Sequence, residues 1–126
     1  MKLRLIVSIC LLVLALGAAL GFGAYLDYSA QTLNAALQHA LDAALRQSPD
    51  WQSATAEVER LWARDKGVLH ILLPHVNLNE LEWALGTLPE YLRERDAALY
   101  VEQCVRSIQC LRTIRETERP SLGNIF

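Results

Sequence analysis

The chain has 126 residues, 52% of them hydrophobic, and a net charge of −2. This length allows one small domain beside a targeting or anchoring segment. Apart from Lys2 and Arg4, the remaining 10 basic and all 14 acidic side chains lie in residues 27–126. Such an acidic balance excludes the basic patch that nucleic-acid binding or adhesion to anionic lipid requires.

The first element is an apolar segment, LIVSICLLVLALGAALGFGAYL, residues 5–26, without a charged residue. At about 1.5 Å per residue it forms a helix of roughly 33 Å, long enough to cross a hydrocarbon core of about 30 Å. Residues 1–4 contain two basic side chains, so they are predicted to stay in the cytoplasm while the C-terminus lies outside. Tyr25 and Tyr28 fit an interfacial aromatic belt.

Two other features of this segment leave alternatives open. The small residues Gly21, Gly23 and Ala24 could end a cleaved secretory signal, but the apolar run exceeds the usual 7–15 residues or so of such signals, which favours an uncleaved anchor. Gly17 and Gly21 form a small-xxx-small motif that lets a second helix approach closely, as in a homodimer through the transmembrane helix. The alternative is that glycine falls at this spacing by chance.

Beyond the anchor, apolar residues recur at helical spacing and no strand pattern finds a partner. The sequence therefore predicts an all-α fold: a single N-terminal transmembrane helix leading into a small antiparallel helical bundle over residues 27–119, with a C-terminal tail over 120–126. A leucine every four residues from Leu33 to Leu45 predicts that the anchor continues into the first bundle helix. Ser48 as N-cap predicts a second helix from Pro49 to about Leu73. Its apolar face comprises Trp51, Ala54, Val58, Leu61, Trp62, Leu69 and Leu72.

The third helix is predicted to start at Asn77, in a capping box with Glu80. Pro89 interrupts its leucine seam, so we expect a kink or short break there, with Thr87 and Glu90 capping the new start. Asp96 can cap a last helix, which a second proline, at position 120, is expected to end. The apolar face of that helix comprises Val101, Cys104, Val105, Ile108, Leu111 and Ile114.

The segment HILLPHVNLNELEWAL, residues 70–85, gathers histidines, asparagines and glutamates around a proline. One interpretation is a metal or acid–base site in which His70 and His75 converge with Glu80 or Glu82. The other is a turn between two packed helices, in which His75 meets open carbonyls and Glu82 faces solvent. We favour the turn, because it gives every polar side chain a structural role.

Three side chains that could carry chemistry or recognition have two readings each. Cys104 and Cys110 lie about 120° apart on a helix and about 9 Å apart along it, beyond disulfide reach, so they are predicted to be buried thiols. An intermolecular bridge through one of them is the alternative. Trp83 falls off the leucine seam and is either the edge of a wide core face, which we favour, or an exposed anchor for a partner.

Several segments together resemble the bacterial domain-of-unknown-function family 4363, short single-span membrane proteins with a helical outer region. They are the basic start with its apolar run, DWQSATAEVERLW, HVNLNELEWALGTLPEYL and ETERPSLGNIF. The resemblance covers nearly the whole chain and departs from the family at Asn79, where an acidic residue is expected, and at Pro89. It implies a fold and a location, but no activity and hence no catalytic residue.

The sequence contains no pattern of an activated nucleophile, phosphate loop or paired thiol, so we expect no enzyme and no cofactor. The leading prediction is a protein-interaction or scaffold module on the outer side of the bacterial cytoplasmic membrane, with an unknown protein partner. The alternative is an extracytoplasmic domain that senses a small ligand or metal through the polar turn around His75. The candidate interaction residues are Gly17, Gly21, His75, Glu80 and Trp83.

Overall fold

The structure is a computed structural model that describes residues 1–73 and 75–123, with the side chains of 1–73, 76 and 78–117. Over these residues four helices follow one another: α1 (Lys2–Arg46), α2 (Trp51–Leu72), α3 (His75–Glu94) and α4 (Ala97–Gly123). The described part of the chain contains no strand, so the prediction of an all-α fold is confirmed.

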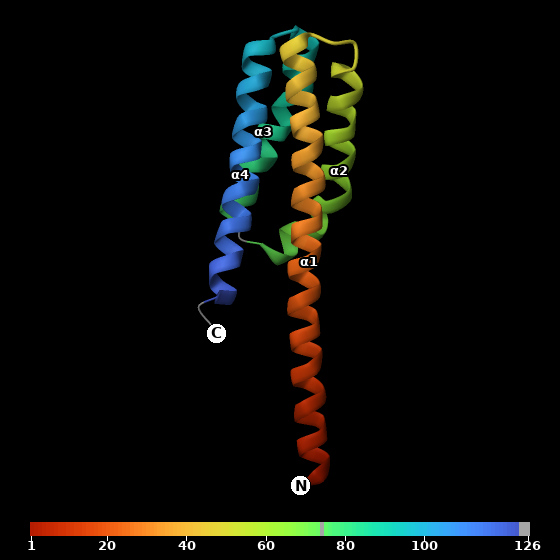
Figure 1. Cartoon of the computed structure of the whole chain (residues 1–126), viewed down its shortest axis with the longest axis vertical. Coiled ribbons are helices and arrows are strands. Elements are labelled where there is room, and N and C mark those ends of the chain that lie inside the picture. The colour runs from red at the N-terminus through yellow and green to blue at the C-terminus, as the bar shows by residue number, and fades with distance from the viewer. Residues whose placement is uncertain (74, 124–126) are drawn as a thin grey trace.

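The helices form an up-down-up-down bundle from which α1 projects (Figure 1). α1 packs against α2 and α4, and α3 packs against the same two helices, so α1 and α3 are diagonal to each other. α1 is one helix of 45 residues, which confirms that the apolar segment continues into the bundle. Its side chains are exposed from Lys2 to Gly21, and we call this part the stalk. Phe22 is the first side chain to pack against the core.

The prediction that the leucine stripe of α1 faces the core is confirmed only in part. Leu33 and Leu37 are buried, whereas Leu45 is 65% exposed and Ala43 and Ala44 are buried in its place. A repeat of four residues runs ahead of the helical period by about 40° at each step, so after three steps the stripe has turned about 120° away from the core. The other fully buried leucines, Leu78, Leu81 and Leu88, all belong to α3.

The boundaries of α2 differ slightly from the prediction. The helix begins at Trp51, two residues after the expected start, and a turn precedes it. In that turn the Ser48 hydroxyl accepts a hydrogen bond from the Asp50 N–H at 3.2 Å, and the Ser48 carbonyl accepts one from the Trp51 N–H at 3.1 Å. At the other end Leu73 is extended (φ −115°, ψ 156°), which confirms that the residue before the proline ends the helix.

Two predictions for α3 are wrong. The helix begins at His75, two residues after the extended Leu73. Asn77 therefore lies inside the helix and cannot be its N-cap. The helix also continues through Pro89 to Glu94, so the short break expected there is wrong, whereas the kink stays a prediction. The Thr87 hydroxyl donates to the Ala84 carbonyl at 2.7 Å instead of capping a new start. Continuing the helix costs a hydrogen bond but keeps the apolar residues on both sides of the proline in the core.

In α4 the predicted start is confirmed and the predicted end is wrong. Asp96 Oδ1 accepts a hydrogen bond from the Leu99 N–H at 3.1 Å, which makes it the N-cap. The helix runs to Gly123, since one proline removes one donor and need not stop a helix that continues on both sides of it.

Two side chains on the predicted apolar faces are exposed, and one polar side chain outside those faces is buried. Val105 of α4 and Leu72 of α2 are exposed, and polar Ser107 is fully buried. Ser107 lies in the buried stripe of α4, which is Tyr100, Cys104, Ser107, Leu111 and Ile114. This stripe has the spacing of three and four residues that faces a neighbouring helix. The serine hydroxyl donates to the Gln103 carbonyl at 2.8 Å, so burial leaves it satisfied.

Candidate functional site

A surface that joins α3 to α4, which we call the Trp83 face, brings together two of the candidate residues. Trp83 is 57% exposed, and the guanidinium carbon of Arg106 lies 6.0 Å from the centre of its ring. Beside them is a shallow depression of about 370 Å³, lined by Glu80, Arg106, Gln109, Cys110 and Thr113. The surface thus combines an exposed aromatic ring with one carboxylate and one guanidinium.

Trp83 is exposed, so the favoured interpretation, the edge of the core, is wrong, and its role as an anchor for a partner stays a prediction. Leu81 and Leu85 both point into the core. Trp83 is two residues from each, and hence about 160° around the helix from both, so its ring points outward.

Neither thiol of α4 has the character of a nucleophile. Burial raises the pKa of Cys104 to about 12. Burial and the Glu80 carboxylate also raise the pKa of Cys110, against a lowering influence of Arg106. Both groups are therefore protonated thiols at neutral pH, and they behave as small apolar side chains.

The polar segment around the proline is confirmed as the connection between two helices, α2 and α3. His70 Nε2 lies 3.3 Å from Glu82 Oε2, so Glu82 pairs with the preceding helix while its side chain is still 44% exposed to solvent. The side chains of His75 and Asn77 lie outside those that the structure describes. Among the described residues, no three His, Cys, Asp or Glu side chains are close enough to hold a metal ion.

A cluster of four polar side chains lies where the stalk meets the bundle, and the sequence did not predict it. We call it the neck cluster; it consists of Tyr25, Tyr28, Arg64 and Asp65. Asp65 is 5% exposed. Its Oδ1 accepts a hydrogen bond from the Tyr25 hydroxyl at 3.0 Å, and the Arg64 guanidinium donates to both of its oxygens at 3.0 Å. Arg64 also lies 5.8 Å from the centre of the Tyr28 ring. The sequence did contain a sign that Asp65 is buried, because it lies three residues after Trp62 and four before Leu69, on the apolar face of the same helix.

The neck cluster should make stability depend on pH. Burial alone would raise the pKa of Asp65, but hydrogen bonds from Arg64 and Tyr25 outweigh burial and hold this pKa below its usual value. The stabilisation is therefore complete above the unfolded-state pKa of about 3.9 and is lost as the pH falls through the folded-state value. Asp65→Asn is expected to remove this acid sensitivity and to cost about 1–3 kcal/mol at pH 7. Thermal melts of the full chain from pH 7 to 3 measure both effects.

Asp42→Asn is the matched control for this prediction. Asp42 pairs with Arg46 at 3.0 Å, but the two side chains are 55% and 74% exposed, so its loss should leave the melts unchanged. An Asp65→Asn variant with the acid sensitivity of the wild type would contradict the assignment.

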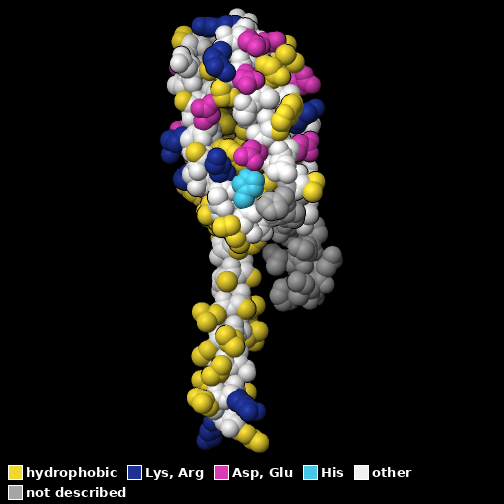
Figure 2. Space-filling view, turned by 180° about the vertical axis from the view of Figure 1, so that it is seen from behind, with side chains coloured by type: hydrophobic (Ala, Val, Ile, Leu, Met, Phe, Trp, Pro, Cys, Tyr) yellow, Lys and Arg dark blue, Asp and Glu magenta, His cyan; other side chains and the backbone are white. Residues whose placement is uncertain are grey.

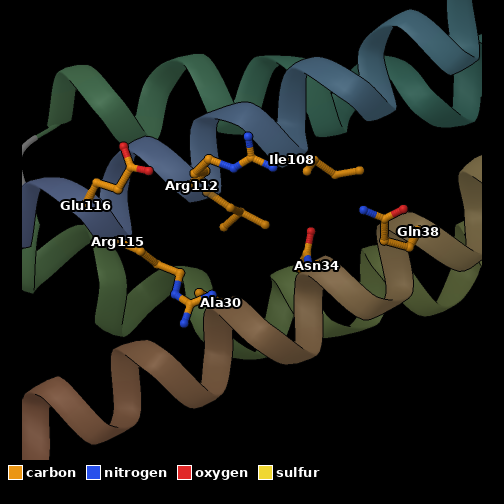
Figure 3. A pocket seen from close by; sticks show the side chains of 8 residues that line it. Ala30, Asn34, Gln38, Ile108, Arg112, Arg115 and Glu116 are labelled. Atoms are coloured by element: carbon orange, nitrogen blue, oxygen red, sulfur yellow. The ribbon is translucent and has the colours of Figure 1, made fainter.

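A second hollow, between α1 and α4, has a volume of about 270 Å³. Figure 3 shows the side-chain amides of Asn34 and Gln38 directed into it from α1, with Arg112 and Ile108 opposite on α4. At one end Arg115 Nε lies 3.5 Å from Asp27 Oδ1. The hollow is open and polar, and its amides and guanidinium groups could hydrogen-bond small polar groups.

Among the side chains that the structure describes, most of the exposed large apolar ones belong to the stalk. Its most apolar stretch of 18 residues has a mean hydropathy of 2.7 and no buried side chain, and it is long enough to span a membrane, as a signal sequence also would be. A Cβ atom added at Gly17 or Gly21 would meet nothing within 4 Å, so packing within one chain does not require these glycines. The homodimer through them stays a prediction.

A family model described as a domain of unknown function (DUF4363) covers residues 21–125. No curated protein and no solved structure matches the chain significantly.

Proposed function

Because the chain belongs to the DUF4363 family, as its segments predicted, and the description of that family assigns no activity, we propose a function from the geometry. The protein is a non-enzymatic, membrane-anchored helical module that presents the Trp83 face to another protein on the outer side of the membrane. The observation that carries this proposal is the stalk, whose apolar side chains are uncovered while the bundle closes its own core without them.

The charge distribution supports the proposed location. Lys2 and Arg4 stand at the free end of the stalk, and the other charged side chains that the structure describes lie in the bundle (Figure 2). By the positive-inside rule, this arrangement fits a single pass through the bacterial cytoplasmic membrane with the N-terminus inside and the bundle outside. The helix is continuous, so the lipid-embedded part would hold the bundle directly at the surface.

The composition of the Trp83 face supports recognition of a protein. Tryptophan and arginine are the residues that most often dominate binding energy at protein interfaces. Here the Trp83 ring and the Arg106 guanidinium already lie against each other, so a partner would meet an ordered pair. The described residues give no comparable support to the ligand or metal sensor around His75 that the sequence left as its alternative.

Trp83→Ala tests the interaction. The variant should weaken binding of a protein partner by about 2 kcal/mol or more, roughly 30-fold in Kd, because it removes the large exposed ring of the surface. The free energy of unfolding should change by less than about 0.5 kcal/mol, since the ring is mainly exposed. Affinity capture of the full chain in native membranes, followed by titration with the captured protein, measures the loss.

Leu45→Ala provides the control, because Leu45 is also an exposed large apolar residue but lies outside the Trp83 face. It should retain the partner with wild-type affinity. Capture that is the same for the wild type and Trp83→Ala, or no protein enriched by the wild type, would contradict the proposal.

A further inference from the structure

α2 ends and α3 begins at the stalk end of the bundle (Figure 1). The sequence of residues 67–79, GVLHILLPHVNLN, contains no aspartate, glutamate, lysine or arginine. We call the described part of this segment, residues 67–73 and 75–79, the hairpin tip; its described side chains are those of 67–73, 76, 78 and 79. Four of its apolar side chains are exposed: Val68 at 43%, Ile71 at 83%, Leu72 at 46% and Val76 at 80%. Apolar side chains that gather in this way on a soluble surface usually mark a binding site.

The opposite end of the bundle has two connections of the same kind with the opposite character. The α1–α2 connection is flanked by Arg46 and includes Asp50. The α3–α4 connection consists of Arg95 and Asp96, directly after Glu94. Helix connections in this fold therefore carry charge where they face away from the stalk and none where they lie beside it. The end of the bundle away from the stalk is therefore suited to contact with water, and the end beside the stalk is suited to a less polar medium.

Helix geometry places the hairpin tip at the level of the proposed membrane surface. A hydrocarbon core of about 30 Å, measured from Leu5 at about 1.5 Å per residue, ends near Ala24. Just beyond, Tyr25 is bonded to Asp65 of α2, and α2 runs back toward the stalk. Ile71 lies about 9 Å further along α2 than Asp65, on the membrane side of Tyr25, so it lies within about 9 Å of the outer edge of the hydrocarbon on its lipid side.

We propose that the hairpin tip inserts shallowly into the outer lipid interface and forms a second attachment of the bundle to the membrane. This inference rests on the proposed anchoring by the stalk. Figure 2 shows hydrophobic side chains at the rim of the bundle from which the stalk emerges, and charged side chains further from the stalk. The insertion is limited to the first turn of α3, because the exposed carboxylate of Glu80 follows Val76 by about 6 Å.

Photo-crosslinking to lipid tests the proposal. The photoreactive residue p-benzoyl-phenylalanine is placed at position 71 or 76 of the full chain, which is then reconstituted into vesicles of phosphatidylcholine and phosphatidylglycerol. After irradiation, mass spectrometry counts lipid adducts. Position 45 is the matched control, since Leu45 is equally a large exposed side chain but belongs to the charged end of the bundle. Position 12, in the middle of the stalk, reports on the anchor itself.

Lipid adducts at positions 71 and 76, with none at 45, are the expected result. Adducts at position 12 but not at 71 or 76 would overturn the inference and leave the anchor intact. Crosslinks from position 71 to a second copy of the chain would overturn it in favour of a homodimer contact. No lipid adduct at any position, including 12, would overturn the proposed anchoring and the inference with it.

Discussion

Leu37→Ala is expected to lower the free energy of unfolding by about 2–5 kcal/mol. Leu37 is completely buried where α1 packs in the bundle, so truncation leaves a cavity that neighbouring helices fill only in part. The loss would be a large fraction of the 5–15 kcal/mol or so that stabilises a typical domain. Urea titration of the full chain in mild detergent, followed by circular dichroism, measures the change.

The same substitution eight residues later provides the control. Leu45 belongs to the same helix and the same leucine repeat but is 65% exposed, so Leu45→Ala should change stability by less than about 0.5 kcal/mol. Because the two variants have the same helix propensity, their difference isolates burial. Equal stabilities for Leu37→Ala and Leu45→Ala would mean that α1 faces the core with another side.

Two arginines in the middle of the stalk should release the protein from the membrane. Each charge at the centre of a spanning helix costs about 2.5–3.5 kcal/mol in insertion free energy. Leu12→Arg combined with Val13→Arg therefore costs about 5–7 kcal/mol, more than the remaining apolar residues are expected to supply. The proportion of protein that stays in the membrane pellet after alkaline carbonate extraction measures the effect.

The control carries two arginines at exposed leucines of the bundle, Leu45→Arg with Leu99→Arg, and should remain in the pellet. The intact mass of the wild type gives an independent check on the anchor. A mature chain that begins after the stalk, or a wild-type chain extracted as readily as the stalk variant, would contradict the proposed anchoring.

Features set by a long local pattern were predictable from the sequence. The apolar run and the leucines after it predicted a single continuous helix, and Asp96 predicted the start of α4. The errors arose where two local signals competed. Asn77 and Glu80 match a capping box, yet α3 begins two residues earlier, at His75, and the core contacts around Pro89 outweighed its missing donor.

The functional surfaces were harder to predict because they join residues from different helices. Trp83 was singled out from its position off the leucine seam, but its partner Arg106 belongs to α4. The pairing of His70 with Glu82 requires knowledge of the angle at which α3 returns along α2. The burial of Asp65 depends on the Tyr25 hydroxyl of another helix, which a single helical pattern does not contain.

The 45 residues of α1 belong to two environments at once, since Leu33 and Leu37 hold the bundle together while Leu12 and Leu16 are exposed on the stalk. Because α1 is one continuous helix, a tilt of the stalk would also tilt the bundle. If the stalk tilts to match a thinner bilayer, the bundle part of α1 turns by the same angle, together with α2, α3 and α4. The orientation in which the module meets its partner would then report the thickness of the lipid beneath it.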